Sequence, residues 1–266
     1  MEWWKKEIEN IKNDNKNGAT FLTLMAIKII KEMSIKRCKK EDIKNALKFL
    51  MSVQPMMASI YNFANIFSKF VELDYEEIIK YCKEFEKEFK KANEKVAKNS
   101  LKCFEDNRTI LTHSFSSLVY NSFLEAKKAG FEFEVICSES RPKNEGVELA
   151  EKLCKEGIKT TLVTDAAAPF FVKNVDIVLF GADGVGDFGL VHKVGSYAIA
   201  LAAKKSKVKV VSLAPTFKFW PKDFKEPKTL LKDPNELAKG CFEVKNFYFD
   251  ITPLELIDSF VTEINI

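Results

Sequence analysis

Glycine and proline are distributed very unevenly along this chain of 266 residues. Only Gly18 and Pro55 fall before residue 129, whereas the other nine glycines and seven prolines follow it. Because these residues are the main breakers of α-helices, a long stretch almost free of both is helical by default. The distribution therefore predicts a helical domain over residues 1–100, followed by a second domain, 101–266, that contains more turns.

Apolar residues recur at helical spacing five times in the first domain. The expected helices cover residues 4–11, 21–29, 43–51, 56–70 and 74–97. Asp74 is placed to cap the last of them, and acidic residues begin the third, where they suit the helix dipole. Lys and Glu interleave on the exposed faces of the fifth helix, which indicates a solvated surface rather than a polyanion site.

From about residue 103 the pattern changes, and short apolar runs alternate with amphipathic stretches. Strands are expected at 109–112, 133–137, 160–163, 177–180, 208–213 and 247–249. Helices are expected at 117–129, 146–155, 167–173, 194–204 and 253–260. Such alternation, with nearly continuous apolar strands, is typical of a parallel sheet that helices cover on both faces. The predicted fold class is therefore α/β, with a mainly parallel sheet after the helical domain.

Composition and motifs exclude several classes of protein. The 42 basic and 38 acidic side chains nearly balance, so we expect no direct contact with nucleic acid. The longest apolar run, Tyr197–Ala203, is far shorter than a membrane span, and the N-terminus lacks a secretory signal. We therefore expect a cytoplasmic protein without membrane contact. The six cysteines include no CxxC pair, and there is no P-loop, GxSxG or HExxH motif, so neither a metal nor a cofactor is expected.

Ligands of parallel sheets bind at the carboxyl ends of the strands, so the turns there are the candidate site. The first turn holds His113 and three serines, Ser114, Ser116 and Ser117. Hydroxyl residues that cap the following helix leave backbone N–H groups free to hold an anion such as phosphate. Capping alone would explain one serine, and His113 is either a catalytic base or a partner of nearby backbone.

Two further turns each carry a charged residue with two open interpretations. Arg141 either clamps a phosphate with its planar guanidinium or forms a surface ion pair with Glu139 or Glu145. Asp165 either caps a helix or takes part directly in chemistry.

The turn after the fourth strand contains the string Gly184–Gly189, which fits GxGxxG. A dinucleotide site also needs a helix that begins inside the motif and an acid about 20 residues later, whereas lysines surround Val208 here. A stronger feature is Asp183, a carboxylate at a strand end that is either a site residue or a turn cap. Lys193 and, from the fifth turn, Lys218 are placed to hold negative charge in the same crevice, although the aromatic residues around Lys218 also suit a packing cluster.

Several of these turns, taken in order, resemble the motifs of one superfamily. They are Ile110–Ser117 (ILTHSFSS), Ser138–Pro142 (SESRP), Thr164–Ala167 (TDAA), Gly181–Asp183 (GAD), Lys193–Ser196 (KVGS) and Thr216–Phe219 (TFKF), with Asn17–Ala19 (NGA) and Gln54–Ser59 (QPMMAS) in the helical domain. The superfamily comprises the alpha, beta and delta subunits of translation initiation factor 2B and the isomerases of methylthioribose 1-phosphate and ribose 1,5-bisphosphate. The likeness covers essentially the whole chain and is strongest to archaeal initiation factor 2B-like proteins.

The resemblance implies a helical domain on a Rossmann-like domain, a homodimer through the C-terminal domains, and a crevice sized for a sugar phosphate. The isomerases use an Asp, which matches Asp183, and a Cys, whose position falls on Ser114. A serine lacks the tunable thiol, so catalysis at Ser114 is doubtful. The ligand-binding residues implied are Asn17, Gly18, Ala19, Gln54, His113, Phe115, Ser116, Ser117, Arg141, His192, Lys193 and Lys218.

This chain departs from the isomerase pattern at three further positions. Asn17 and Gln54 each replace an arginine, so two fixed cations that would hold phosphate are lost, and His192 replaces an asparagine. These departures favour a regulatory or binding protein of the initiation factor 2B class, without nucleotide exchange of its own, which associates with translation initiation factor 2 or senses a phosphorylated small molecule. The alternative is an aldose-1-phosphate isomerase of altered specificity, which the retained Asp183 supports. A third hypothesis, a nicotinamide-dependent oxidoreductase, rests on the glycine string alone.

Overall fold

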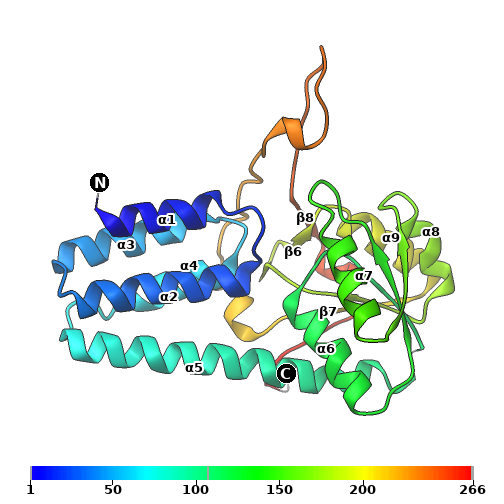
Figure 1. The fold of residues 1–266 in the computed structure, drawn as a ribbon, viewed down its shortest axis with the longest axis horizontal. Coiled ribbons are helices and arrows are strands. Elements are labelled where there is room, and N and C mark those ends of the chain that lie inside the picture. Colours follow the sequence, from blue (N-terminus) through cyan, green and yellow to red (C-terminus); the bar gives the residue numbers. More distant parts are fainter. Residues whose placement is uncertain (1, 107, 265–266) are drawn as a thin grey trace.

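The structure, a computed structural model, describes residues 2–106 and 108–264. Its first hundred residues fold into helices that pack side by side (Figure 1). These are α1 (Trp3–Asn13), α2 (Ala19–Ile35), α3 (Lys40–Val53), α4 (Ala58–Phe67) and α5 (Tyr75–Asn99). All five helices expected from the apolar spacing are present. Asp74 occupies the N-cap position of α5, but its side chain makes no capping hydrogen bond.

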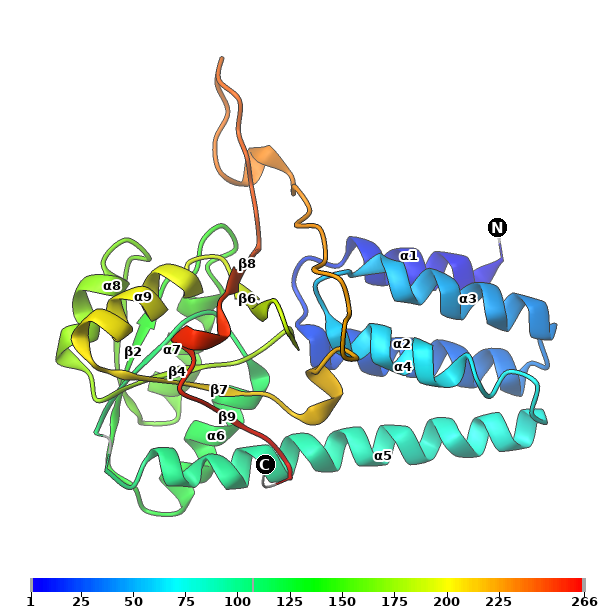
Figure 2. The same cartoon turned by 180° about the vertical axis from the view of Figure 1, so that it is seen from behind.

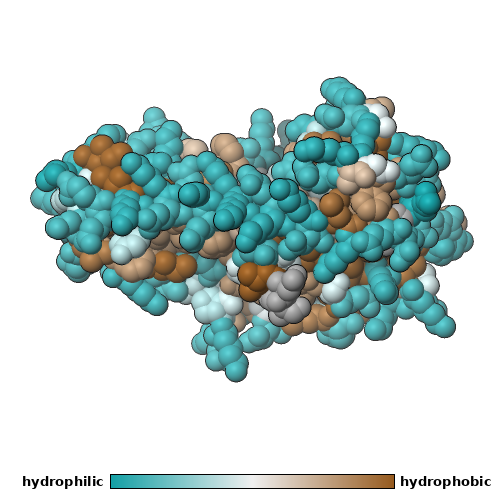
Figure 3. Space-filling model, turned by 90° about the horizontal axis from the view of Figure 1, so that it is seen from below, coloured by the Kyte–Doolittle hydropathy of each residue, from teal (hydrophilic) through white to brown (hydrophobic). Residues whose placement is uncertain are grey.

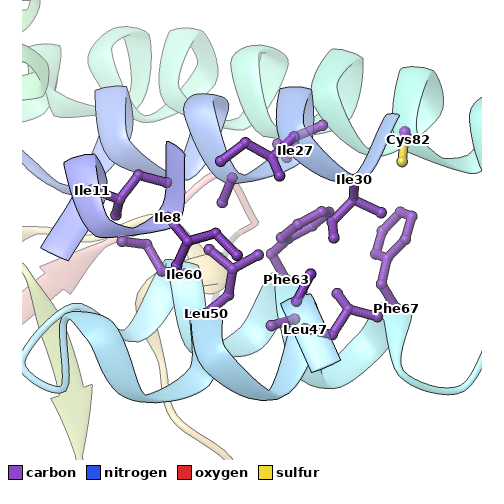
Figure 4. Close-up of a cluster of buried hydrophobic side chains, with 14 of the residues drawn as sticks. Ile8, Ile11, Ile27, Ile30, Leu47, Leu50, Ile60, Phe63, Phe67 and Cys82 are labelled. Carbon is purple, nitrogen blue, oxygen red and sulfur yellow. The ribbon is translucent and has the colours of Figure 1, made fainter. Parts of the chain in front are cut away.

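The helical part has its own hydrophobic core, part of which is drawn in Figure 4. Ile8 of α1, Leu47 of α3 and Phe63 of α4 are almost completely buried there. α2 packs against α1, α3, α4 and α5, which explains why its sequence is apolar on nearly every side. α5 is longer than its neighbours and continues beneath the second part of the molecule, where it packs on α6 (Ser117–Lys128) (Figures 1 and 2). The domain boundary at residue 100 stays a prediction.

The second part is built on a six-stranded, wholly parallel sheet in the order β3-β2-β1-β4-β7-β9. The strands are β1 (Thr109–Thr112), β2 (Glu134–Ser138), β3 (Lys159–Val163), β4 (Ile177–Phe180), β7 (Lys209–Leu213) and β9 (Ser259–Val261). The covering helices are α6, α7 (Glu145–Lys155), α8 (Ala168–Phe171) and α9 (Ser196–Ser206). Every residue of β4 is buried, as expected for a central parallel strand. The expected α/β class with a parallel sheet is confirmed.

The strand order places the topological switch point between β1 and β4. From β1 the chain moves outward through β2 to β3, then crosses back to β4 and moves the other way through β7. The loops that leave β1 and β4 therefore diverge, and a crevice opens beyond the carboxyl ends of these two strands.

A second, three-stranded sheet lies beside the first in the order β5-β6-β8. β5 (Gly184–Gly186) and β6 (Gly189–Lys193) form an antiparallel hairpin, and β8 (Phe249–Thr252) pairs with β6. The glycine string 184–189 is thus the hairpin itself and not the strand-to-helix turn of a dinucleotide site.

The end of the chain differs from expectation. Residues 253–260 were expected to form a helix, but only the short 3-10 helix Leu254–Leu256 forms, and the chain then adds β9 to the sheet. β9 pairs in parallel with β7, Val211 standing opposite Ser259. The local spacing of the apolar residues favours a helix, but pairing with β7 satisfies the backbone hydrogen bonds of both strands at the sheet edge.

Between β7 and β8 the chain forms an arm, residues 221–247, that projects away from the body of the molecule (Figure 1). Its only regular element is the 3-10 helix Pro234–Glu236. No helix within the described ranges is both long and apolar enough to cross a membrane. The face shown in Figure 3 is mostly hydrophilic, with apolar side chains in separate patches, as expected from the interleaved Lys and Glu residues.

Candidate functional site

A cavity of about 370 Å³ lies between the helical part and the sheet part. The helical side contributes the segment 14–21, which leads into α2, together with Gln54 and Met57. The sheet side contributes the turns beyond β1 and β4, the end of β6, the start of α7, Lys218, and the base of the arm. The volume suits a small ligand, and the position at the switch point is where sheets of this order bind them.

Asp183 lines this cavity directly after β4. Its backbone is held on both sides, because its amide donates to the carbonyl of Val191 (2.9 Å) and its carbonyl accepts from the amide of Ala58 (3.0 Å). Burial raises the pKa of the Asp183 carboxyl to about 6, although the nearby ammonium groups of Lys218 and Lys193 oppose that rise. Its side chain can therefore exchange a proton near neutral pH.

Lys218 brings a buried cation to the cavity. It is 4% exposed, and its ammonium donates to the carbonyl of Ala182 (2.5 Å). Burial lowers its pKa, and the charge of Asp183 acts in the opposite direction. The side-chain amide of Asn62, in α4, donates to the carbonyls of Phe217 (2.9 Å) and Phe219 (2.7 Å), on either side of Lys218. The sequence left open whether this turn serves the site or packs aromatic rings, and it does both, since Phe217 contacts rings of α5.

Two more lysines reach the cavity from different elements. Lys193, at the end of β6, forms a buried ion pair with Glu145 (Nζ–Oε1 2.7 Å) at the start of α7. Lys232, at the base of the arm, is half-buried and donates to the side-chain oxygen of Asn15 (3.1 Å). Among the described residues, no carboxylate lies within ion-pairing distance of Lys232. The charge of Lys232 is therefore not balanced by an ion pair, and burial lowers the pKa of its ammonium group.

The start of α6 forms one wall of the cavity. Ser116 is its N-cap, and the hydroxyl oxygen accepts from the amide of Val119 (3.4 Å). Ser114 precedes it in the left-handed region, with φ of 68°, and donates its amide to the hydroxyl of Ser140 (2.7 Å). Gly181 must be glycine here, because a Cβ atom would lie 2.6 Å from the Ser116 side chain. The free amides of this helix start suit an anion.

The start of α2 forms the opposite wall, on the helical side. Gly18 is its N-cap and offers no side-chain cap. Asn17 is turned toward Asp14, whose carboxylate accepts from the backbone amide (2.8 Å) and the side-chain amide (2.8 Å) of Asn17. Gln54 also lines the cavity, but its side-chain nitrogen donates to the carbonyls of Ile11 (2.9 Å) and Lys12 (3.1 Å). The amide group of Gln54 thus satisfies the C-terminal end of α1.

The cavity therefore brings together most of the residues singled out from the sequence. They are Asn17, Gly18, Ala19, Gln54, Ser114, Phe115, Ser116, Ser117, Asp183, His192, Lys193 and Lys218. His113 and Arg141 do not line it.

His113 is buried beneath the cavity, where both ring nitrogens have partners. Nε2 lies 2.8 Å from the carbonyl of Val194, and Nδ1 contacts the hydroxyl of Ser138. Desolvation lowers the pKa of His113 to about 4, so the ring is neutral. Of the two interpretations open for His113, a partner of nearby backbone is therefore the one the structure supports.

Arg141 points toward the arm, where its guanidinium donates to the carbonyl of Glu236 (3.3 Å). Arg141 does not line the cavity, and among the described residues it forms no ion pair with Glu139 or Glu145. Asp165 accepts from the backbone amides of Ser140 (2.7 Å) and Arg141 (2.6 Å), so it holds the turn after β2 and does not cap α8. Both side chains serve loop structure because the turn after β2 lies farther from the switch point than those after β1 and β4.

Sequence reasoning missed six charged residues that line the cavity: Asp14, Lys16, Glu145, Glu148, Lys152 and Lys232. The sequence predicts Glu145 only as an ion-pair partner of Arg141, although its place after the SESRP motif is a usable signal. Lys232 lies in the arm, where no periodicity marks an element. None of the described residues forms a cluster of His, Cys, Asp or Glu able to hold a metal ion.

Residues 11–266 match the Initiation factor 2 subunit family. The chain is 33% identical to a ribose 1,5-bisphosphate isomerase of Methanocaldococcus jannaschii, over 100% of this chain and 92% of that protein. It is 31% identical to a putative translation initiation factor eIF-2B subunit 2-like protein of Pyrococcus furiosus, over 98% and 95%. The crystal structure of translation initiation factor eIF-2B from Pyrococcus horikoshii OT3 superimposes with a TM-score of 0.89, at 27% identity, over 99% and 96% of the two chains.

Proposed function

We propose that this chain, which belongs to the Initiation factor 2 subunit family, binds a phosphorylated sugar in its cavity and interconverts the aldose and ketose forms. The observation that carries the proposal is Asp183, a half-buried carboxyl at the switch point whose pKa is raised to about 6. An aldose–ketose isomerisation moves hydrogen between C1 and C2 of the sugar and needs a group that accepts a proton and returns it. A carboxyl with a pKa close to the working pH does both efficiently.

The surroundings of Asp183 fit an anionic ligand. The start of α6 offers backbone amides, and Lys193, Lys218 and Lys232 bring positive charge to the same cavity. Glu145 neutralises Lys193, Glu148 pairs with Lys152, and Asp183 partly offsets Lys218. Lys16, Lys232 and the helix starts remain as positive groups of the cavity without an ion-pair partner among the described residues. A ligand with at least one phosphate matches this distribution, and names among the relatives of the chain include a ribose 1,5-bisphosphate isomerase.

A second candidate is a protein that binds the same kind of ligand without turnover and acts in regulation. The observation that favours it is Ser114, a hydroxyl where the resemblance places the catalytic thiol. A serine hydroxyl does not exchange a proton near pH 7 unless a base adjoins it, and the nearest histidine in sequence, His113, has both nitrogens occupied. In this role the protein would associate with translation initiation factor 2, and we propose a homodimer through the sheet part for either function.

The deciding experiment combines an isomerase assay with a thermal shift measurement on the same preparation. Ribose 1,5-bisphosphate and methylthioribose 1-phosphate are the two substrates to test. We expect turnover of one of them. Asp183→Asn should lower the rate of that turnover at least a hundredfold, while the ligand still raises the melting temperature of the variant. Binding without turnover supports the regulatory candidate, which a pull-down with initiation factor 2 then tests. If the protein shows neither binding nor turnover, both candidate functions are overturned.

A further inference from the structure

The second histidine of the chain, His192, differs from His113 in how its ring is used. His192 lies in β6 opposite Asp250 of β8 and is 3% exposed, yet it lines the cavity. Its ring packs against Phe180, with centroids 5.3 Å apart. Only one of its two ring nitrogens, Nδ1, has a hydrogen-bond partner among the described residues, the hydroxyl oxygen of Ser196 at 2.8 Å.

The partners of Ser196 determine which nitrogen of His192 carries the proton. A serine hydroxyl has one hydrogen to donate, and that of Ser196 lies 2.7 Å from the backbone carbonyl of Lys193, which only accepts. With its hydrogen committed there, the Ser196 oxygen can only accept from His192. Nδ1 of His192 therefore carries the hydrogen, and Nε2 holds an unshared electron pair.

His113 shows the opposite arrangement. Its Nε2 faces the carbonyl of Val194 and must donate, so its Nδ1 accepts from the hydroxyl of Ser138. The centroids of the two rings lie 6.2 Å apart, with the ring planes inclined at 72° to each other. The chain thus contains one histidine with both nitrogens occupied and one with a free acceptor.

The free Nε2 of His192 lies close to the proposed anion site. A Cβ atom at Gly181 would lie 3.5 Å from this nitrogen and 2.6 Å from the Ser116 hydroxyl, so both groups border the same small space. Burial, together with the positive charge of Lys218 and Lys193, holds the pKa of His192 well below its usual range. The ring therefore stays neutral, and Nε2 is an acceptor throughout the physiological pH range.

We propose that Nε2 of His192 accepts a hydrogen bond from a hydroxyl group of the bound ligand, so that the cavity selects polyhydroxylated phosphates over simple anions. This inference rests on the proposed binding of a phosphorylated sugar. A phosphate or carboxylate oxygen is itself an acceptor and would be repelled by the lone pair on Nε2 of His192. A cationic donor would be repelled by the lysines nearby. A neutral hydroxyl beside the phosphate is the donor that both conditions allow.

The first test is nitrogen-15 NMR of this chain, whose sequence has only two histidines. The signals are assigned by comparison with His192→Asn, which removes one set. We expect the neutral Nδ1–H form for His192 and the neutral Nε2–H form for His113, with no change between about pH 6 and 8. An Nε2–H form of His192 would overturn this inference alone and leave the proposed function untouched.

The second test measures the affinities of ribose 5-phosphate and inorganic phosphate for three proteins. His192→Phe removes the acceptor, whereas His192→Asn keeps an acceptor oxygen. We expect His192→Phe to lower the affinity for ribose 5-phosphate about tenfold without changing the affinity for phosphate. The affinity of His192→Asn for ribose 5-phosphate should stay within about threefold of that of the unchanged protein. Equal losses for both ligands in His192→Phe, or no loss, would contradict a hydroxyl contact. If the unchanged protein binds neither ligand, the proposed function and this inference both fail, although the tautomer result still stands.

Discussion

The backbone amide of Ala58 donates to the carbonyl of Asp183 at 3.0 Å, so the first residue of α4 holds the residue that carries the half-buried carboxyl of the cavity. Four residues later, Asn62 of the same helix holds the carbonyls on either side of Lys218. One short helix of the helical part thus fixes the backbone of both the carboxyl and its neighbouring cation. The site is incomplete without the helical part, even though both charged groups belong to the sheet part.

Asn62→Ala should therefore weaken ligand binding although Asn62 does not line the cavity. Losing both hydrogen bonds leaves the carbonyls of Phe217 and Phe219 without this partner and frees the turn that carries Lys218. We expect a loss of stability of about 1–3 kcal/mol and a several-fold loss of affinity for ribose 5-phosphate. The matched control is Asn93→Ala, since Asn93 makes a similar side-chain bond to the carbonyl of Phe89. A control that loses as much affinity would contradict the role of Asn62.

Binding of an anion should depend on the protonation of Asp183. A bound negative charge raises the pKa of this carboxyl further above about 6, so binding takes up a proton. Affinity for sulfate, whose own charge is constant, should fall as the pH rises from about 5 to about 7. Calorimetry on the protein and on Asp183→Asn measures this, and the variant should bind sulfate with little dependence on pH. An equal dependence in both proteins would show that another group titrates.

Ser114→Cys should raise isomerase turnover, because a thiol with a pKa near about 8.5 exchanges protons at neutral pH more readily than a hydroxyl. The exchange of oxygen for sulfur leaves the backbone contact of residue 114 with Ser140 unchanged. We expect at least a tenfold gain with ribose 1,5-bisphosphate. Ser117→Cys, which places a thiol elsewhere on the same wall, is the control. If both variants gain equally, or neither gains, residue 114 is not the position that matters.

Lys232→Met should weaken the binding of phosphorylated ligands without lowering the stability of the free protein. The ammonium of Lys232 is half-buried without a carboxylate partner, so its removal breaks one hydrogen bond, to Asn15, and one cation–π contact, with the ring of Tyr248. We expect the melting temperature to stay constant and the affinity for ribose 5-phosphate to fall about tenfold at low salt. Lys239→Met, at an exposed position on the same arm, should change neither quantity. A large drop in melting temperature for Lys232→Met would show that the lysine is structural.

The sequence by itself determined the helices of the first part, the strands β1, β2, β3, β4 and β7 of the parallel sheet, and the turns in which to look for a site. These features depend on local periodicity, as with Ile110 and Leu111 in β1 or Val178 and Leu179 in β4, and local periodicity is visible in one dimension. It also singled out Asp183, because a carboxylate between glycines at the end of an apolar strand is conspicuous. The family motifs supported the same choice.

Only the tertiary structure decided which strand-end residues meet. Arg141 and Lys232 have similar charge, yet Arg141 turns to the arm while Lys232 reaches the cavity from a segment without any periodic signal. The segment 253–260 has the spacing of a helix, but pairing with β7 makes part of it a strand. The tautomer of His192 follows from a carbonyl that the fold places beside Ser196. In each case the deciding interaction joins groups that only the folded chain brings together, so spacing along the sequence carries no record of it.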